Sequence, residues 1–340
     1  MSYRTHVPKA VSTWLFVVAG FICLMILIGG ATRLTDSGLS ITEWKPISGA
    51  IPPITQQDWL EEFDLYRQTT EYQEQNRGMS MEEFRFIFWW EWGHRQLGRL
   101  IGLIYAVPLL FFWVRGDLTA RLKPRLLVLL ALGGLQGAIG WWMVASGLVD
   151  RLDVSQYRLA THLGMAFVLL AGVVWTALDA RYGAPPVRSG TMVRWFGFIW
   201  AMIFLQIIMG AFVAGLDAGR IFNTWPLMHG QLIPDGYLGG HSFFVAIFES
   251  HAAVQLQHRW MAYLLAILIA VTAYRIYRQP RVALKPFMVL LPGLTLVQIV
   301  LGIITLLAVA PLGLSLIHQG GAIALFLAAT AATWTARRAV

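Results

Sequence analysis

Four histidines stand at comparable places in long apolar runs of the sequence, where few polar side chains are expected. They are His94, His162, His258 and His318. Two neutral imidazoles that face each other across an apolar space can ligate a haem iron from both sides. A single membrane histidine often bonds only to a neighbouring helix, but four in matching places favour ligation. Copper or zinc is an alternative, although the histidines are too widely spaced to share a site on one helix.

Small residues accompany these histidines and would let a flat macrocycle approach the backbone. They are Gly98 and Gly102 after His94, Ala262 and Ala266 after His258, and a glycine at i+2 and an alanine at i+4 after both His162 and His318. Three glutamines, Gln136, Gln206 and Gln298, each stand four residues before a glycine. We expect these amides to form hydrogen bonds between helices.

One carboxylate distinguishes the two halves of the chain. Glu91 precedes His94 by three residues on the same helix face, whereas Gln255 holds the matching place before His258. A carboxylate in a membrane is a candidate for moving protons or stabilising a cation, and the alternative is a structural pair with an arginine. The residues therefore predict an oxidoreductase with a reactive haem site in its first half and a holding or reducing haem site in its second.

Three arginines stand beside the candidate ligands: Arg95, Arg99 and Arg259. A guanidinium group suits the propionates of a haem, because it binds carboxylates through two parallel hydrogen bonds. Ordinary snorkelling to the membrane surface is the alternative role for such residues.

The composition places all these residues in a membrane. Of 340 residues, 57% are hydrophobic and 13% are charged, about half the charged share of a soluble domain. A soluble enzyme and a disordered chain are both excluded. The net charge of +8 is explained by membrane topology, so no nucleic-acid partner is expected. The one cysteine, Cys23, excludes an intramolecular disulfide.

Eight apolar runs are long enough to cross a bilayer as helices, for which about 20 residues suffice. They cover residues 13–32, 88–114, 125–147, 157–178, 194–215, 257–277, 287–309 and 315–335. The first run is not expected to be a cleavable signal peptide, because it is too long and seven further runs follow. We therefore predict an all-α integral membrane protein with eight transmembrane helices.

The two halves match span for span. An Asp-x-Gly segment with a tryptophan eight residues after the aspartate begins at Asp36 and again at Asp217. With four spans each, both halves enter the membrane from one side, which predicts a parallel repeat rather than the inverted repeat of many transporters. The expected architecture is two four-helix bundles, an N-terminal one in 1–178 and a C-terminal one in 179–340.

Basic residues gather on one side of the predicted spans. More than half of the 26 Lys and Arg residues lie at the termini and in the second, fourth and sixth loops, almost without acids. The positive-inside rule makes this the cytoplasmic side and places both termini there. His6 is expected to be solvated on this side. The histidines of the fifth loop are expected to line the opposite surface rather than bind metal: His229, His241 and His251.

The longest loop, 33–87, lies on the opposite side and is rich in Asp and Glu. Thr55 with Asp58, and Ser80 with Glu83, have capping-box spacing and predict two helix starts. We expect a short interfacial helix and then a turn into the second span. Its apolar residues recur at helical spacing: Trp59, Leu60, Phe63 and Tyr66.

The sequence resembles the haem A synthase family over nearly its whole length. The resemblance rests on residues 29–35, 37–40 and 44–46, on the Glu91-x-x-His94-Arg95 segment, and on His162, His258 and His318. It implies that haem O is converted to haem A by oxidation of the C8 methyl group to a formyl group, for use in terminal cytochrome oxidases. It also implies an essential acidic role for Glu91, haem O ligation by His94 and His162, and a haem B held by His258 and His318.

The resemblance is to the branch without an outer cysteine pair, found in mitochondria and related bacteria, because loop 33–87 contains no cysteine. No transit peptide is visible, so we expect a bacterial inner membrane. Two other functions stay open: a bis-histidine b-type cytochrome for electron transfer, and a membrane transporter.

The expected partners are membrane lipid and an electron donor, either ferredoxin-like or a quinol. Haem O synthase, cytochrome oxidase assembly factors and a second copy of the chain are candidate neighbours. An iron with two histidine ligands has no free position for oxygen. Either one of His94 and His162 leaves the iron during turnover, or oxygen does not attack at that iron, and the sequence does not decide between these. Our hypothesis is that both ligands are bound at rest and that one of them is labile.

Overall fold

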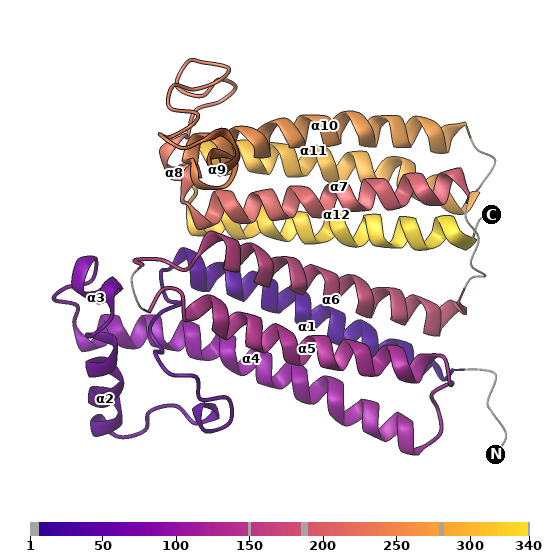
Figure 1. Cartoon of the computed structure of the whole chain (residues 1–340). Coiled ribbons are helices and arrows are strands. Elements are labelled where there is room, and N and C mark those ends of the chain that lie inside the picture. The colour runs from indigo at the N-terminus through magenta and orange to yellow at the C-terminus, as the bar shows by residue number, and fades with distance from the viewer. Residues whose placement is uncertain (1–6, 149–150, 185–189, 279–281, 339–340) are drawn as a thin grey trace.

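The computed structural model describes residues 7–148, 151–184, 190–278 and 282–338. Its regular elements in these ranges are helices, apart from one isolated β-bridge. Eight helices are long and apolar enough to cross a membrane: α1 (Lys9–Leu34), α4 (Met81–Val114), α5 (Leu122–Val144), α6 (Gln156–Tyr182), α7 (Thr191–Gly215), α10 (His251–Tyr277), α11 (Lys285–Leu307) and α12 (Leu312–Arg338). The predicted all-α fold class with eight membrane-spanning helices is confirmed (Figure 1).

Short helices occupy the long loops. They are α2 (Gln56–Tyr66), α3 (Thr70–Glu74), α8 (Ala218–Ile221) and α9 (Phe243–Glu249), with 3-10 turns at Ser48–Ala50 and Val282–Leu284. Both predicted capping boxes are present, at Thr55 with Asp58 and at Ser80 with Glu83. The second box starts α4 at Met81, well before the apolar run that predicted a span from 88. Helix α4 is therefore longer than its membrane-spanning part.

The eight long helices pack as two sets of four (Figure 1). In the first group, α1 and α5 each contact α4 and α6; in the second group, α7 and α11 each contact α10 and α12. Contacts of α6 with α7, and of α12 with α1 and α6, hold the groups together. A relation between the groups by an internal repeat stays a prediction.

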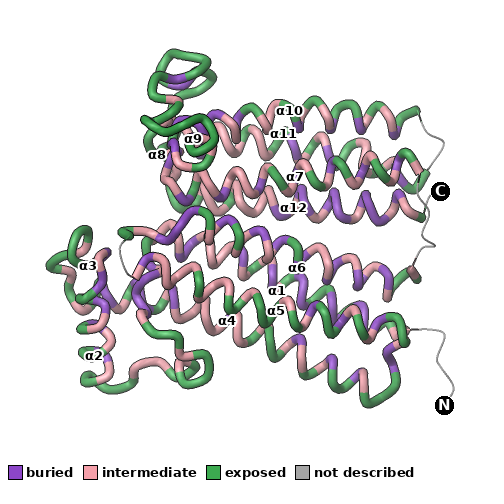
Figure 2. Tube along the Cα trace, in the orientation of Figure 1, coloured by how far each residue is buried: buried purple, intermediate pink, exposed green. Residues whose placement is uncertain are grey.

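A continuous apolar core runs through both groups. Buried residues recur along α1, α6, α7 and α12, where the groups meet (Figure 2). The rings of Phe167 and Phe326 meet there edge to face with centroids 5.0 Å apart. On the outside, α4 exposes Leu103, Val107 and Leu110 by 61–65%. Such a surface belongs in hydrocarbon, so packing between helices rather than burial from water holds the groups together.

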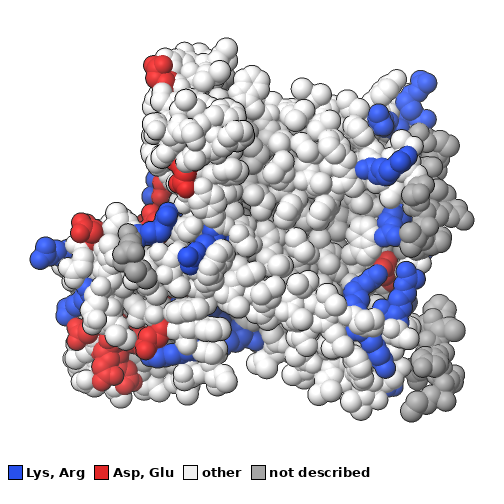
Figure 3. All heavy atoms as spheres, in the orientation of Figure 1, with Lys and Arg blue, Asp and Glu red and all other residues white. Residues whose placement is uncertain are grey.

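Charged residues gather at the two ends of the helices (Figure 3). At the end where α1 begins and α12 ends, called the basic end here, the charged residues are mostly Lys and Arg, whereas the other end, called the acidic end, has most of the Asp and Glu together with further Lys and Arg. At the basic end Arg125 pairs with Asp179 at 2.6 Å, and Trp334 donates to the same carboxylate. Four residues of the N-terminus and the loops that are predicted to be cytoplasmic lie outside the described residues: Arg4, His6, Arg188 and Arg281.

Helix α2 docks on the first turns of α4 at the acidic end. Trp59, Phe63 and Tyr66 are buried there against Phe84 and its neighbours, and the Phe63 and Phe84 rings stack 4.7 Å apart. Leu60, predicted to share this face, is 41% exposed. One residue advances a helix by about 100°, so the residue after Trp59 turns away from a face that repeats at i, i+4 and i+7.

Candidate haem-binding site

The two predicted ligands of the first group are seated against glycines of neighbouring helices. A Cβ on Gly29 of α1 would lie 3.1 Å from Nε2 of His94, which α4 contributes. A Cβ on Gly140 of α5 would lie 2.9 Å from Cε1 of His162, which α6 contributes. Both distances are shorter than ordinary van der Waals contact, so a side chain at either position would push the imidazole away.

The second group repeats the arrangement. A Cβ on Gly210 of α7 would lie 3.2 Å from His258 of α10, and a Cβ on Gly302 of α11 would lie 2.9 Å from His318 of α12. His258 and His318 lie within electrostatic reach of each other, as do His94 and His162 in the first group. The structure thus brings the predicted ligands together in pairs, one pair in each group.

Three of the four histidines are also tied through their backbone to the neighbouring helix. A glutamine amide donates to the carbonyl oxygen of the histidine: Gln136 to His162 (3.0 Å), Gln206 to His258 (3.0 Å) and Gln298 to His318 (2.8 Å). The expected hydrogen bonds between helices are confirmed. Each glutamine stands one turn before the glycine that seats the same histidine, so one helix face both holds the backbone and accommodates the ring.

The glycines at i+2 of two histidines have a different role from the predicted one. A Cβ on Gly164 would meet Cδ1 of Ile208 on α7 at 2.7 Å, and the nearest atom to one on Gly320 is Cδ2 of Leu27 on α1 at 3.8 Å. Two residues turn a helix by about 200°, so these glycines point away from the histidine and toward the other group. The expectation that they open space beside the ligand was wrong, because they admit the facing group instead.

Several buried polar atoms near the histidines have no partner among the described residues. They are Nδ1 of His162 and His318, Oε1 of Gln136, Gln206 and Gln298, and Nε and Nη1 of Arg259. Unpartnered buried groups are costly and uncommon in folded proteins. Imidazoles in apolar surroundings, with a guanidinium free to bind a carboxylate, form a set that a haem and its propionates would satisfy. The residues present therefore fit haem.

Glu91 is a buried anchor one turn before His94. Its side chain is 3% exposed and forms an ion pair with Arg95 at 2.7 Å. Its Oε2 also accepts hydrogen bonds from the Ser40 hydroxyl and the Ile41 amide, both at 2.8 Å. The alternative of a pair with a nearby arginine is therefore what the structure contains. A role of Glu91 in the chemistry stays a prediction.

Arg95 and Arg99 bind the backbone of the segment that Glu91 also holds, residues 40–46. Arg95 donates to the carbonyls of Ile41 and Glu43, and Arg99 to those of Lys45 and Pro46, at 2.8–3.0 Å. The segment is closed against α5 by a stack of Trp44 on Trp141, with centroids 6.0 Å apart. In this structure the two guanidinium groups hold the chain at the acidic end, and propionate binding by them stays a prediction.

The second group has a sparser set of contacts at the matching place. Gln255 donates to the Phe222 carbonyl at 3.3 Å, and Arg259 donates to the same oxygen at 3.0 Å. Arg259 is 9% exposed, and its Nε and Nη1 remain without a partner there. Of the three predicted arginines, Arg259 is the one with donors available for a ligand.

Sequence comparison decides the family of this chain. It matches the cytochrome oxidase assembly protein family over residues 12–330. It is 69% identical to the haem A synthase of Maricaulis maris over 332 residues. This matched region covers 98% of this chain and 97% of the relative. The chain belongs to the haem A synthase family.

Other haem A synthases are similar over nearly the whole chain. The enzyme of Parvibaculum lavamentivorans is 50% identical over 93% of this chain and 91% of the relative. That of Caulobacter vibrioides is 45% identical over 98% of both. Together with the eight apolar helices, these relatives make the chain a multi-pass membrane oxidoreductase of the bacterial haem A synthase family.

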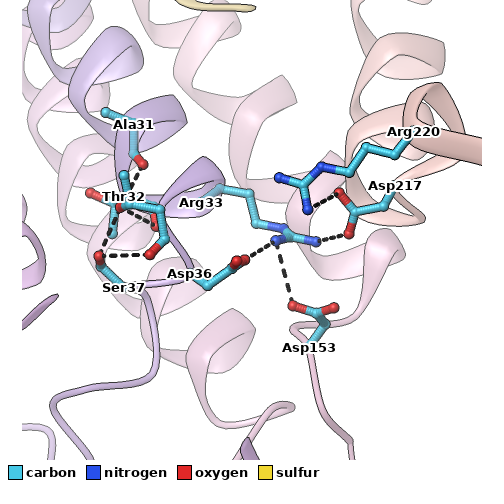
Figure 4. A network of polar contacts seen from close by, with 9 residues as sticks. Ala31, Thr32, Arg33, Asp36, Ser37, Asp153, Asp217 and Arg220 are labelled. Atoms are coloured by element: carbon cyan, nitrogen blue, oxygen red, sulfur yellow. Dashed lines mark hydrogen bonds and ion pairs between the residues drawn. The ribbon is translucent and has the colours of Figure 1, made fainter. Parts of the chain in front are cut away.

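Arg33 lies in residues 29–35, one of the segments on which the resemblance to haem A synthases rests. Nothing in the sequence indicated its role. Its side chain is 13% exposed and lies 3.0 Å from Asp36, 3.5 Å from Asp153 and 3.0 Å from Asp217, while Arg220 also contacts Asp217 (Figure 4). Burial raises the pKa of Asp36, and the positive charge of Arg33 opposes that shift. Arg33 thereby joins the two groups at the acidic end.

The matching aspartates were visible in the sequence, but their meeting was not. Asp36 and Asp217 follow α1 and α7, and both have a φ of 50°. A left-handed backbone is tolerated by aspartate better than by most residues. Each aspartate thus turns the chain at the same point after its helix, which brings both carboxylates to Arg33.

The histidines of the long loop between α7 and α10 are exposed, as expected: His229, His241 and His251. Among the described residues, no cluster of three or more His, Cys, Asp or Glu side chains could hold a metal ion. His251 begins α10, on which His258 also lies.

Proposed function

We propose that this chain is a haem A synthase that oxidises the C8 methyl group of haem O to a formyl group and so provides haem A for terminal oxidases. The observation that carries the proposal is the set of four partly buried histidines, each packed against a glycine of a neighbouring helix, in a chain whose relatives are haem A synthases. Haem needs this arrangement, because an imidazole has to reach the iron while the helix surfaces around the flat ring stay apolar.

The first group, within residues 1–178, binds the substrate haem O through His94 and His162. Glu91 lies one turn before His94 and fixes residues 40–46 across the acidic end of the site through the Ser40 hydroxyl and the Ile41 amide. The apolar faces of the helices exclude water from the reacting methyl group. A buried carboxylate beside a reacting centre is suited to accept a proton or to stabilise positive charge.

The second group, within residues 179–340, holds a resident haem B through His258 and His318, and Arg259 binds one of its propionates. Haem B supplies a one-electron redox centre. The second group has Gln255 where the first has Glu91, so it carries no carboxylate for proton transfer at the matching place. This difference supports a holding and electron-transferring role for the second group.

The chain is placed in the bacterial inner membrane with its basic end and both termini in the cytoplasm. Positively charged loops are retained on that side, and the end where α1 begins shows Lys and Arg with few acidic residues in Figure 3. Lipid surrounds the apolar helix faces. A quinol or a ferredoxin-like protein delivers electrons, and haem O synthase and oxidase assembly factors are the expected neighbours.

The test is to purify the protein from cells that make haem O, extract its haems in acid, and identify them by chromatography and mass. The proposal expects haem B together with haem O, a hydroxylated haem O, or haem A. Haem B alone, despite available haem O, would indicate an electron-transfer cytochrome. A folded protein without haem would contradict both functions and favour a transporter.

A further inference from the structure

Each of the four histidines packs against a glycine of a neighbouring helix, and this glycine contact is called its seat. At three of the seats a glutamine hydrogen bond is also present, and at the fourth it is missing. In three of them a glutamine stands one turn before the seating glycine and donates to the carbonyl of the histidine. In the seat of His94 the residue one turn before Gly29 is Met25. The methyl group of Met25 packs 3.0 Å from where a Cβ on Gly98 of α4 would lie. A thioether cannot donate a hydrogen bond, so the His94 backbone has no such tie to α1.

The missing tie changes what restrains the ligand. A carbonyl that accepts a hydrogen bond from a neighbouring helix fixes the two helices against each other at that level. Around His94, α4 is instead held by Glu91 and Arg95, and both bind the non-helical residues 40–46. Methionine is flexible and tolerates shifts of its neighbours. Among the described residues, the turn of α4 that carries His94 can therefore shift together with residues 40–46 without breaking a hydrogen bond to α1 at this level.

We infer that His94 is the labile ligand of haem O, while His162 stays bound to the iron. This inference rests on the proposed function, because it requires haem O in the first group. The bond that breaks joins the iron to the imidazole nitrogen of His94, and the lone pair stays with the imidazole. The open coordination position then lies on the α4 side, next to Glu91 and beneath residues 40–46. No oxidation or reduction accompanies this step.

Carbon monoxide measures the open position, because it binds only where a ferrous iron has lost a ligand. The purified full-length protein is loaded with haem O, reduced, and titrated with carbon monoxide. Met25→Gln supplies the missing amide donor. The expected result is a three- to tenfold weaker carbon monoxide affinity at haem O, about the worth of one neutral hydrogen bond. An unchanged affinity in a variant that retains haem O would overturn the inference.

The matched variants change the other seats. Gln136→Met loosens His162 and should strengthen carbon monoxide binding at haem O. Gln206→Met loosens His258 and should make the second haem reactive with carbon monoxide, which the native protein should resist. If both leave carbon monoxide binding as in the native protein, the glutamine tie does not control lability and the inference is wrong.

Ligand removal gives a readout that does not depend on the hydrogen bond. His94→Ala should keep haem O bound through His162, with a five-coordinate, high-spin ferrous spectrum. His162→Ala should lose most of its haem O, because the remaining ligand is the loosely held one. The reverse pattern would assign lability to His162. If the native protein binds no haem O in its first group, the proposed function fails and not merely this assignment.

Discussion

The two four-helix groups both pack their histidines against glycines, but they differ in the contacts around those histidines. In the first group, Glu91 and two arginines hold residues 40–46 across the acidic end. In the second group, Gln255 and Arg259 share one carbonyl, and Arg259 keeps two donors free. In the first group, the turn that carries His94 is tied to the non-helical residues 40–46, whereas both histidines of the second group are tied to a neighbouring helix by a glutamine.

Under the proposed function, this difference suits the two groups to two different tasks. A resident cofactor is best held by ligands on helices that are bonded to each other, because its site need not open. A substrate has to enter and leave, so its site needs an element of lower local stability. Single substitutions test the proposed contrast between a firmly held haem and an exchangeable one.

The largest effect is expected when a ligand of the second group is removed. His258→Ala should eliminate nearly all haem B from that group, because one imidazole of the pair is lost and the apolar site has no substitute. His251→Ala on the same helix is the control, since His251 is exposed and should not affect haem content. Haem extraction with mass detection checks both. Full retention of haem B in His258→Ala would refute the ligand assignment.

The carboxylate that distinguishes the first group gives the next largest effect. Glu91→Gln should retain haem but lower conversion of haem O at least about 100-fold, the usual worth of a positioned acid or base. Glu82→Gln, an exposed residue of the same helix, should convert haem O normally. Product haems are measured over time after addition of haem O and reductant. Normal conversion by Glu91→Gln would leave Glu91 as an anchor of residues 40–46 only.

The contact between the groups is expected to contribute moderately to stability. Arg33→Gln leaves Asp36, Asp153 and Asp217 facing one another without their shared cation. We expect a loss of about 1–3 kcal/mol, below the range for a fully buried pair, because these aspartates are 32–46% exposed. Arg220→Gln, with one contact at 3.5 Å, should cost less than about 0.5 kcal/mol. Thermal unfolding of both variants in detergent, at low and at high salt, measures these losses. Equal stability of Arg33→Gln and Arg220→Gln would argue against Arg33 as the residue that joins the two groups.

The smallest effect concerns the docked helices at the acidic end. Burial raises the pKa of Glu71 to about 8, above its ordinary value of 4.5. Between these two pH values the folded protein binds more protons than the unfolded chain, so stability falls as the pH rises toward 8. Glu71→Gln should remove this loss and leave α3 about 1 kcal/mol more protected at pH 8, but unchanged near pH 4.5.

Hydrogen exchange of the α2–α3 region at the two pH values measures the effect of Glu71→Gln. Glu74→Gln, an exposed neighbour, should follow the native protein at both. An identical pH response of the native protein and Glu71→Gln would mean that the carboxyl is not protonated in the fold.

Local patterns in the sequence determined the elements of this protein. A run of about 20 apolar residues has to become a helix in a membrane, because backbone groups find no water there. Capping boxes act within one helical turn, so Thr55 and Ser80 marked the starts of α2 and α4 correctly. The four histidines, and the glutamines placed to bond between helices, were also visible, because few polar residues occur in such runs without a role.

Only the tertiary structure decided which residues meet. Gly164 lies two residues after His162, yet it admits a side chain of α7, because its direction depends on the helix face turned to the other group. Arg33 meets Asp153 and Asp217 across long stretches of chain, and Glu91 finds Ser40 and Ile41 in a loop without periodicity. Such partners are set by how helices pack and how loops return. Short-range spacing therefore predicted the candidate ligands, but not the contacts around them.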